Sequence, residues 1–305
     1  MLLENGDPVA VENPGYRAAR LAFAATGAVP HGIDLDAEGL RSDRLAGIAG
    51  CRLAYVTPSH QYPTGVTLSL ARRLELLEWA ERADGWIVED DYDGEYRYSG
   101  TPLAPLAALD RQGRVLYVGT FCKIAFPALR LGYLVVPPAL VERFRQRRAI
   151  EVRHSEVGTQ RVMADFIAEG HFQRHVRRMR RAARARRDAL LRGWPEAPGC
   201  QPLPAVEAGL HLCVRVDSLG AGAGPDRRGG SRRGGSQRLE ATTGWTTPAL
   251  RQTTARAWCW ASRQYPRRVS MRRCGRCARP GGGRPWLDPS SRLTRMPPDH
   301  PRAQE

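Results

Sequence analysis

One lysine in an arginine-rich chain is the first residue whose type could do chemistry. Of the 47 basic residues among 305, 46 are Arg, and Lys123 is the single Lys. A guanidinium stays protonated and cannot form an imine, whereas a primary amine can attack a carbonyl carbon. Composition alone also allows the chance survival of one lysine, so the neighbours of Lys123 have to decide between these interpretations.

Four segments place polar and aromatic residues just beyond predicted strands. They are residues 12–16, 57–65, 89–95 and 119–123, and Arg130 follows the last of them by seven positions. Ligands of parallel sheets bind at the carboxyl ends of the strands. We therefore expect the four segments to contribute to one site.

The residue types in these segments suit pyridoxal phosphate. Lys123 would supply the imine to the aldehyde carbon and, once displaced by a substrate amine, would act as the base that moves the proton from Cα. The ring withdraws electrons only while its nitrogen stays protonated, and the carboxylate of Asp90 is the candidate that keeps it so. Tyr92 would donate to the ring hydroxyl oxygen.

The phosphate and the ring face also have candidate partners. Arg130 and the hydroxyl of Thr120 would hold the phosphate, where a guanidinium fork fits well. Tyr16 would stack on the ring, although an ordinary place in the core is an alternative for this residue. Pro127 breaks any single helix between Lys123 and Arg130, so helical spacing cannot bring those two side chains together.

Simpler interpretations remain open for the other polar residues. Asp90, Asp91 and Asp93 could be turn residues or ligands of a hard cation, but their spacing lacks the glycine and distal Glu of a calcium loop. Arg130 could pair with a local carboxylate. His60 is predicted to be a hydrogen-bonding loop residue without a catalytic role, and we predict no metal site.

Alternating strands and helices must position these residues. Apolar runs predict strands at 8–12, 52–57, 86–89, 115–118 and 131–136, and helical periodicity predicts helices at 16–26 and 69–83. The second helix is expected to bury Leu70, Leu74, Leu77 and Trp79. A long helical region, 142–192, is interrupted near Gly158 and Gly170. Residues 1–216 are therefore predicted to form an α/β domain, with a mainly parallel sheet flanked by helices.

The net charge of +16 could suggest a nucleic-acid-binding protein, but its distribution argues otherwise. Residues 217–305 hold 18 Arg and six acidic residues, so the first 216 residues carry only +4. Arginines also crowd residues 174–187. We interpret this stretch as a solvated helix whose Arg stems cover apolar surface, because no interleaved aromatic residues suit base stacking and no helix-turn-helix precedes it.

The tail, 217–305, is rich in Arg, Gly and Pro and has neither a strand nor a helix period, so we do not expect it to fold. Its lone pair Cys274 and Cys277 is a weak zinc signal without a second pair. The odd total of seven Cys argues against a disulfide framework. No apolar run is long enough to span a membrane and no signal peptide is visible, so we expect a soluble cytoplasmic protein.

Four motifs, in order and at fitting spacing, resemble those of fold-type I aminotransferases, and most of all the aminotransferase-like domain of MocR-type regulators in the GntR superfamily. They occupy residues 12–16, 59–65, 89–93 and 119–133. The resemblance runs from about residue 3 to about 216. It implies Lys123 as the cofactor lysine, Asp90 as the pyridinium partner, Tyr92 as the ring-hydroxyl partner, Arg130 as the phosphate arginine and Tyr16 as the stacking residue.

The chain departs from that family in several places. Cys122 stands where Ser usually precedes the lysine, and Tyr62 where ordinary aminotransferases have Asn. The winged helix-turn-helix of the regulators and the small domain of the enzymes are not recognised. We expect a fragment with a frameshift near residues 217–225, with impaired or no turnover, and no direct DNA binding by itself.

Two function classes stay open. One is an enzyme that transfers an amino group between an amino acid and a 2-oxo acid. The other is the sensing domain of a regulator, which binds the cofactor with a small amino acid or amine. A homodimer is expected by resemblance alone.

Overall fold

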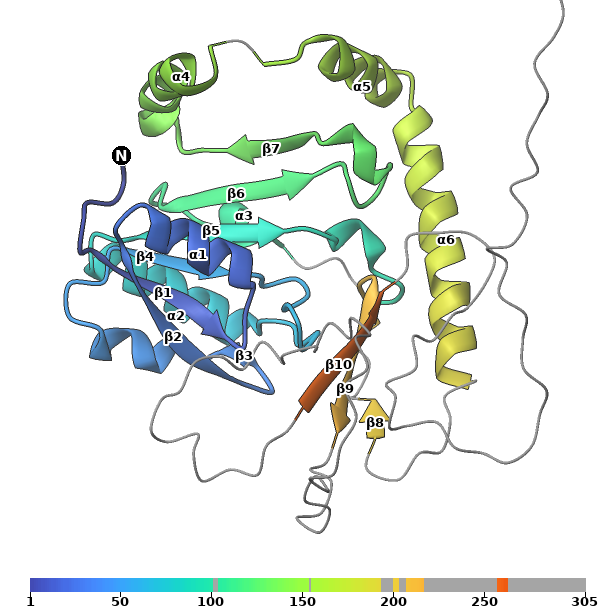
Figure 1. Cartoon of the computed structure of the whole chain (residues 1–305), viewed down its shortest axis with the longest axis horizontal. Helices are drawn as coiled ribbons and strands as arrows, with labels where there is room; N and C mark the ends of the chain where they lie inside the picture. Colours follow the sequence, from blue (N-terminus) through green and yellow to red (C-terminus); the bar gives the residue numbers. More distant parts are fainter. Residues whose placement is uncertain (101–103, 154, 193–199, 203–206, 217–256, 263–305) are drawn as a thin grey trace, which may run out of the picture. The chain divides into compact units, whose positions relative to one another are not determined.

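The fold of the chain is known from a computed structural model. It describes residues 1–100, 104–153, 155–192, 200–202, 207–216 and 257–262, all within one of two compact units, Met1–Ser270. Its main feature is a seven-stranded sheet in the order β3-β2-β1-β4-β5-β6-β7 (Figure 1). The predicted α/β class is therefore confirmed.

The five inner strands are parallel, as expected for strands joined by crossover helices. They are β1 (Pro8–Asn13), β2 (Val29–Asp36), β4 (Leu53–Val56), β5 (Trp86–Asp91) and β6 (Val115–Thr120). The edge strands β3 (Gly39–Leu40) and β7 (Gly132–Val135) pair antiparallel. β2 was not predicted, because most of its residues are exposed and it lacks an apolar run.

Helices occur in each region predicted to be helical. The helices are α1 (Arg17–Ala25), α2 (Leu70–Arg82), the short α3 (Leu106–Leu109), α4 (Pro138–Val152), α5 (Gly158–Ala168) and α6 (His171–Arg192). The short α3 was not predicted. Short 3₁₀ helices occupy Ser42–Gly47, Gly94–Tyr96 and Pro127–Leu129. Ser69 begins α2 by accepting a hydrogen bond from the Arg72 backbone N–H at 3.3 Å.

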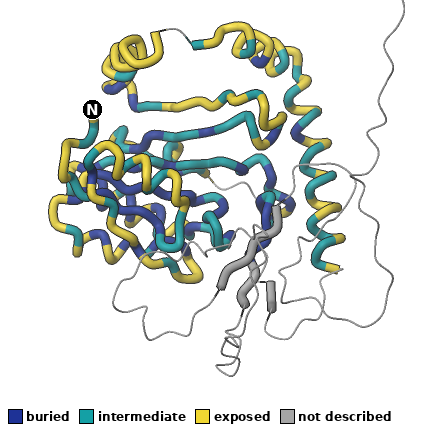
Figure 2. Tube along the Cα trace, viewed as in Figure 1, coloured by how far each residue is buried: buried dark blue, intermediate teal, exposed yellow. Residues whose placement is uncertain are grey.

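Helices cover both faces of the sheet. On one face, Leu76 and Trp79 of α2 pack with Ile87 and other strand residues. On the other, Phe23 of α1 packs with Val9, Val11 and Tyr55. Figure 2 shows the buried residues gathered in the central strands, whereas α4 and α5 are mostly exposed.

The predicted buried face of α2 is partly wrong. Leu70 and Leu74 are 60% and 46% exposed, and Leu77 is only partly buried. The helix instead buries Arg73 with Leu76, Trp79 and Ala80. A guanidinium occupies a core position because backbone carbonyls satisfy it, as described below, and hydrophobic spacing could not reveal this exchange.

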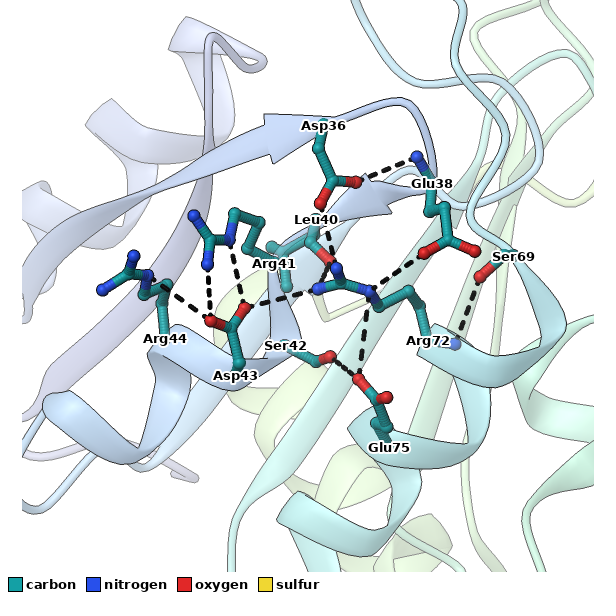
Figure 3. A network of polar contacts seen from close by, with 10 residues as sticks. All are labelled: Asp36, Glu38, Leu40, Arg41, Ser42, Asp43, Arg44, Ser69, Arg72 and Glu75. Carbon is teal, nitrogen blue, oxygen red and sulfur yellow. Dashed lines mark hydrogen bonds and ion pairs between the residues drawn. The ribbon is translucent and has the colours of Figure 1, made fainter.

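Arg72, the neighbour of Arg73, joins α2 to the β2–β3 edge (Figure 3). Its Nη2 lies 2.9 Å from the Asp36 carboxylate, and its Nη1 lies 3.4 Å from Asp43 and 3.5 Å from the Leu40 carbonyl oxygen. Glu75 accepts a hydrogen bond from the hydroxyl of Ser42. The network fixes the start of α2 against the edge of the sheet.

A smaller antiparallel sheet contains β8 (Cys200–Pro202), β9 (His211–Val216) and β10 (Ala257–Ser262). The last of these strands belongs to the tail that was predicted not to fold. The rest of the tail, including Cys274 and Cys277, lies outside the described residues, so the prediction for it stays a prediction. Within the described residues, no helix is long and apolar enough to cross a membrane.

The arginine-rich helix α6 has two faces. Val176 is buried, and Phe172, Met179 and Ala183 pack on the cluster of Tyr96, Tyr98 and Ile124. The side chains that face solvent include Arg174, Arg177, Arg178, Arg181, Arg184, Arg186 and Arg192. This arrangement agrees with the interpretation of a solvated helix.

Candidate functional site

The acidic residues of the site begin inside β5. The sequence suggested that Asp90 and Asp91 follow a strand that ends at residue 89. The strand instead runs through Asp91, so both residues belong to it. Successive side chains of a strand point to opposite faces. Asp90 accepts a hydrogen bond from the Tyr55 hydroxyl, and Asp91 accepts one from the Tyr117 hydroxyl at 2.7 Å.

Among the described residues, no cation forms an ion pair with the Asp90 carboxylate. Burial raises the pKa of Asp90, and the negative charges of Asp91 and Asp93 raise it further. The hydrogen bond from Tyr55 opposes these effects, and no cation in the described part of the chain is among the groups that shift this pKa. A positively charged ligand atom beside Asp90 would therefore be stabilised.

Hydrogen bonds and packing fix the backbone of the turn that carries Lys123. Ile124 is fully buried beside Tyr96 and Val176. The Tyr96 hydroxyl donates to the Lys123 carbonyl oxygen at 3.0 Å, and Nε2 of His175 bonds to the Ile124 carbonyl oxygen at 2.8 Å. The side chain of Lys123 is exposed. The backbone is thus fixed while the amine stays accessible.

The β6–β7 hairpin brings Thr120 near Arg130. Thr120 pairs with Gly132, two residues beyond Arg130, and the Phe121 N–H donates to the Leu131 carbonyl oxygen at 3.0 Å. Arg130 has a left-handed backbone with φ of 48° and is exposed. Because none of the ion pairs among the described residues includes Arg130, the alternative of a local carboxylate partner gains no support.

Hairpin hydrogen bonds also engage the smaller polar side chains of this loop. The Thr120 hydroxyl oxygen accepts a hydrogen bond from the Cys122 N–H at 3.2 Å. The Cys122 thiol donates to the Leu131 carbonyl oxygen at 3.6 Å. The Thr120 hydroxyl itself donates to the Leu131 carbonyl oxygen at 3.5 Å, so it keeps acceptor capacity for a ligand but no second donor. The thiol is likewise directed at the backbone.

A row of aromatic rings connects Tyr16 to Tyr92. The Tyr16 ring meets Tyr62 edge-on at 5.7 Å, and Tyr62 lies 6.3 Å from Tyr92. Tyr16 is 46% exposed, so it is not a core residue. The Tyr92 hydroxyl donates to the His60 carbonyl oxygen at 2.8 Å, so in this structure its proton is already engaged.

Glu12 is a buried site residue that the sequence reasoning did not single out. Its carboxylate accepts from the Thr57 N–H at 3.1 Å, from the Thr57 hydroxyl at 2.5 Å and from Gln61 at 3.0 Å. Burial raises the pKa of Glu12 to about 7, although these hydrogen bonds oppose the shift. The signal was its place at the end of the first predicted strand, two residues before Pro14-Gly15.

His211 is a second residue that the motifs did not indicate. Burial and the neighbouring His60 lower the pKa of His211 to about 4, and Lys123 adds a smaller effect in the same direction. The ring of His211 lies 5.6 Å from that of Tyr62. It comes from β9, nearly 90 positions beyond Lys123, and only the fold brings it to this region.

The structure connects some of the six predicted site residues through other residues. Within the described residues, no hydrogen bond or ion pair joins any two of Lys123, Asp90, Tyr92, Arg130, Tyr16 and Thr120. Tyr62 links Tyr16 with Tyr92, and the hairpin links Thr120 with Arg130. Asp90 and Thr120 lie at the carboxyl ends of neighbouring strands, β5 and β6.

Comparison with known proteins identifies the family of the chain. Residues 1–219 match the family model described as aminotransferase class I and II. The chain belongs to this family. It is also similar to two regulators. The uncharacterized HTH-type transcriptional regulator YhdI of Bacillus subtilis is 39% identical over 215 residues, which cover 70% of this chain and 46% of YhdI.

The second regulator is the probable rhizopine catabolism regulatory protein MocR of Rhizobium meliloti. It is 43% identical over 183 residues, which cover 59% of this chain and 36% of MocR. The chain therefore spans less than half the length of either regulator.

A solved enzyme shares the fold. The kynurenine aminotransferase of Pyrococcus horikoshii, in complex with PMP, KYN and KYA, superposes with a TM-score of 0.66 at 34% sequence identity. The match covers 72% of this chain and 56% of the enzyme. The resemblance inferred from the motifs is thus confirmed for the family and for the fold.

Proposed function

We propose that this chain binds pyridoxal phosphate covalently through Lys123 and handles a small amino acid or amine there. The observation that carries the proposal is the closed loop between β6 and β7. It fixes the backbone of Lys123 and leaves the amine exposed, with Thr120 and Arg130 at its base. The PMP bound by the related Pyrococcus enzyme, a form of the same cofactor, supports the assignment.

The residues present fit this cofactor at three places. Asp90 offers a carboxylate that lacks a cation and would keep a ring nitrogen protonated. Arg130 is exposed and has none of the ion pairs of the described residues, so it is available for a phosphate. Lys123 is the one side-chain primary amine.

Tyr92 fits less directly than the other residues. Its hydroxyl donates to the His60 carbonyl oxygen, so donation to a ring hydroxyl would require this bond to break. Tyr16, exposed at the start of α1 and in contact with Tyr62, is free to cover a ring face. These roles of Tyr92, Tyr16 and Thr120 remain parts of the proposal.

The chemistry then divides between cofactor and chain. Pyridoxal phosphate, when bound, supplies an aldehyde that captures amines and a ring that withdraws electrons from the adjacent carbon. Lys123 would hold the cofactor through its amine and, once released, would take or return the proton at the substrate Cα. Asp90 would keep the ring nitrogen protonated.

Covalent labelling tests the proposal cleanly because the chain has one lysine. Wild-type protein treated with pyridoxal phosphate and then borohydride should carry one pyridoxyl group, which peptide mass mapping should locate at Lys123. Lys123→Ala should lose this label and keep at most a trace on the N-terminal amine. Arg130→Met should weaken cofactor binding about 10- to 100-fold, as expected for a charge-assisted phosphate contact.

A matched control separates a built site from general lysine reactivity. The double variant Lys123→Ala/Arg143→Lys keeps one lysine but places it on the exposed surface of α4. It should not be labelled at low cofactor concentration. If it reacts as fast and as completely as wild type, the amine of Lys123 is not part of a cofactor site and the proposal fails.

The second candidate is a sensing domain, favoured by the 39% and 43% identity to the two regulators. Enzyme and sensor differ in turnover. After an amino acid is added to the loaded chain, conversion of the cofactor to its amine form with release of a 2-oxo acid would favour the enzyme. A spectral change without a 2-oxo acid product would favour the sensor.

The homodimer likewise stays a proposal. Large apolar side chains are exposed on β7, α4 and α5, among them Leu134, Val135, Ile150 and Val162. Such surface is larger than isolated exposed residues would explain and suits contact with another chain. Light scattering after size exclusion would give the mass in solution.

A further inference from the structure

Three buried side chains form a cluster that the cofactor chemistry does not use. His60, Asp93 and His211 are 4%, 2% and 8% exposed, and each offers one donor atom such that the three atoms lie within 4.8 Å of one another. His60 precedes the cis Tyr62-Pro63 peptide, Asp93 follows β5, and His211 begins β9. Sequence reasoning predicted no metal site, because these residues are far apart in the chain.

The hydrogen bonds around the cluster prepare it for a ligand. Nε2 of His211 lies 3.1 Å from the Pro63 carbonyl oxygen, so the proton sits on Nε2 and Nδ1 keeps its lone pair. Metal-binding histidines usually hold a backbone carbonyl in this way with the ring nitrogen that does not bind the metal. The orientation of His211 is therefore fixed before any ion arrives.

Asp93 has one satisfied oxygen and one free one. Oδ2 lies 3.0 Å from Nδ1 of His60 and accepts from the Leu210 N–H at 3.1 Å. Oδ1 is buried and has no hydrogen-bond partner among the described residues. A buried acceptor without a partner destabilises a protein, so a network built only for stability would not leave this oxygen unpaired.

An ion has a way to reach the cluster. His60, Asp91 and Asp93 line a cavity of about 260 Å³. Gly209, with φ of +83°, lies so close to the His60 ring that a Cβ would approach it to 1.8 Å. Gly209 thus holds the His60 ring tightly on one side, and His60 also lines the cavity. A ligand of a selective site needs such a fixed position.

We propose that His60, Asp93 and His211 bind a zinc ion. Two imidazoles and one carboxylate are the nitrogen and oxygen donors that Zn²⁺ takes in tetrahedral sites, with water in the fourth position. Binding requires that the three donor atoms close from their present spacing to about 2.0–2.2 Å from the ion. The proton between His60 and Asp93 leaves as the metal enters.

Metal binding by the full chain, stripped with chelator and free of pyridoxal phosphate, tests this site alone. The starting protein is the Cys274→Ser/Cys277→Ser variant, so that the tail thiols cannot bind zinc. Equilibrium dialysis should give one Zn²⁺ per chain, and Zn²⁺ should raise the melting temperature while Mg²⁺ should not. Co²⁺ in its place should show the visible absorption of a tetrahedral site.

Variants locate the ligands. Asp93→Asn and His211→Gln should each weaken Zn²⁺ binding at least tenfold, whereas His211→Cys, which restores a zinc ligand, should retain it. The matched control is His171→Gln, because His171 lies 3.0 Å from Glu169 but is exposed; its affinity should equal that of the starting protein.

Two results would overturn the proposal. One is a starting protein that binds no Zn²⁺ and keeps its melting temperature. The other is equal binding by the starting protein and by folded Asp93→Asn, with folding checked by circular dichroism. If a variant fails to fold, the dialysis and Co²⁺ spectra of the starting protein still decide. None of these outcomes depends on whether Lys123 binds pyridoxal phosphate.

Discussion

Replacing Arg73 by Met should be among the most damaging single changes in α2. Nε and the two Nη atoms of Arg73 donate to the carbonyl oxygens of Leu68, Ala104 and Pro58 at 2.9–3.0 Å. Nη1 also lies 3.9 Å from Glu89, which is fully buried. The substitution keeps much of the volume but removes every donor.

The loss of stability arises because Glu89 and three carbonyl oxygens lose their partner. Removing one partner of a buried ion pair typically costs 3–5 kcal/mol, since the other charge stays buried without compensation. The three carbonyl oxygens lose their donors as well, but contributions of one network do not add. We expect the free energy of unfolding to fall by about 4 kcal/mol. The backbone N–H groups of Leu106 and Ala107 still bind Glu89 and limit the loss.

Urea unfolding followed by far-UV circular dichroism measures this change. Arg82→Met is the matched control in the same helix, because Arg82 is 70% exposed and pairs with exposed Glu78 at 3.4 Å. It should cost no more than about 0.5 kcal/mol. If Arg73→Met also costs less than about 1 kcal/mol, the interpretation of Arg73 as the buried tie between α2 and the loop from Pro58 to Leu68 is refuted.

Two further predictions concern the site. Because the pKa of Glu12 is raised from 4.5 to about 7, the folded chain holds a proton that the unfolded chain has released, and the free energy of unfolding should fall by about 3 kcal/mol as the pH rises from 4 to 8. Glu12→Gln should remove that part of the slope in urea unfolding across this range, and equal slopes would contradict the assignment. Gly209→Ala should cost at least about 3 kcal/mol, since a Cβ would overlap the His60 ring, whereas Gly6→Ala, with similar positive φ and open space, should cost only about 1 kcal/mol.

Local patterns in the sequence predicted the strands that carry the candidate site and the residues at their ends. β1, β4, β5 and β6 are apolar runs, and each of the four motifs lies at the carboxyl end of one of them. Lys123 was found from composition, because an amine that reacts with a carbonyl cannot be exchanged for a guanidinium. Asp90 was chosen over Asp91 by its spacing to Lys123. The structure places both residues inside β5, where successive side chains point to opposite faces.

Contacts between distant segments could not be predicted in the same way. Tyr55 of β4 meets Asp90 of the neighbouring parallel strand β5, and His211 meets His60 from a strand just over 150 positions later. Neither pair has a local signal, because tyrosine in a strand and histidine near glycine are common. The prediction that Leu70 and Leu74 are core residues was wrong for a related reason. Periodicity assigns the apolar side of α2 to the core, but the fold offers three carbonyl acceptors to Arg73 instead.

Asp90 differs from several other carboxylates of this arginine-rich chain in its partner. With 46 arginines in the chain, buried and exposed carboxylates have many possible partners, and Asp43, Glu89 and Glu207 each contact one. Among the described residues, Asp90 contacts none and is held by the Tyr55 hydroxyl. A tyrosine orients a carboxylate without neutralising it, which leaves the charge of Asp90 for a cation from outside the chain. A protonated ring nitrogen, carried by a cofactor bound to Lys123, meets that requirement.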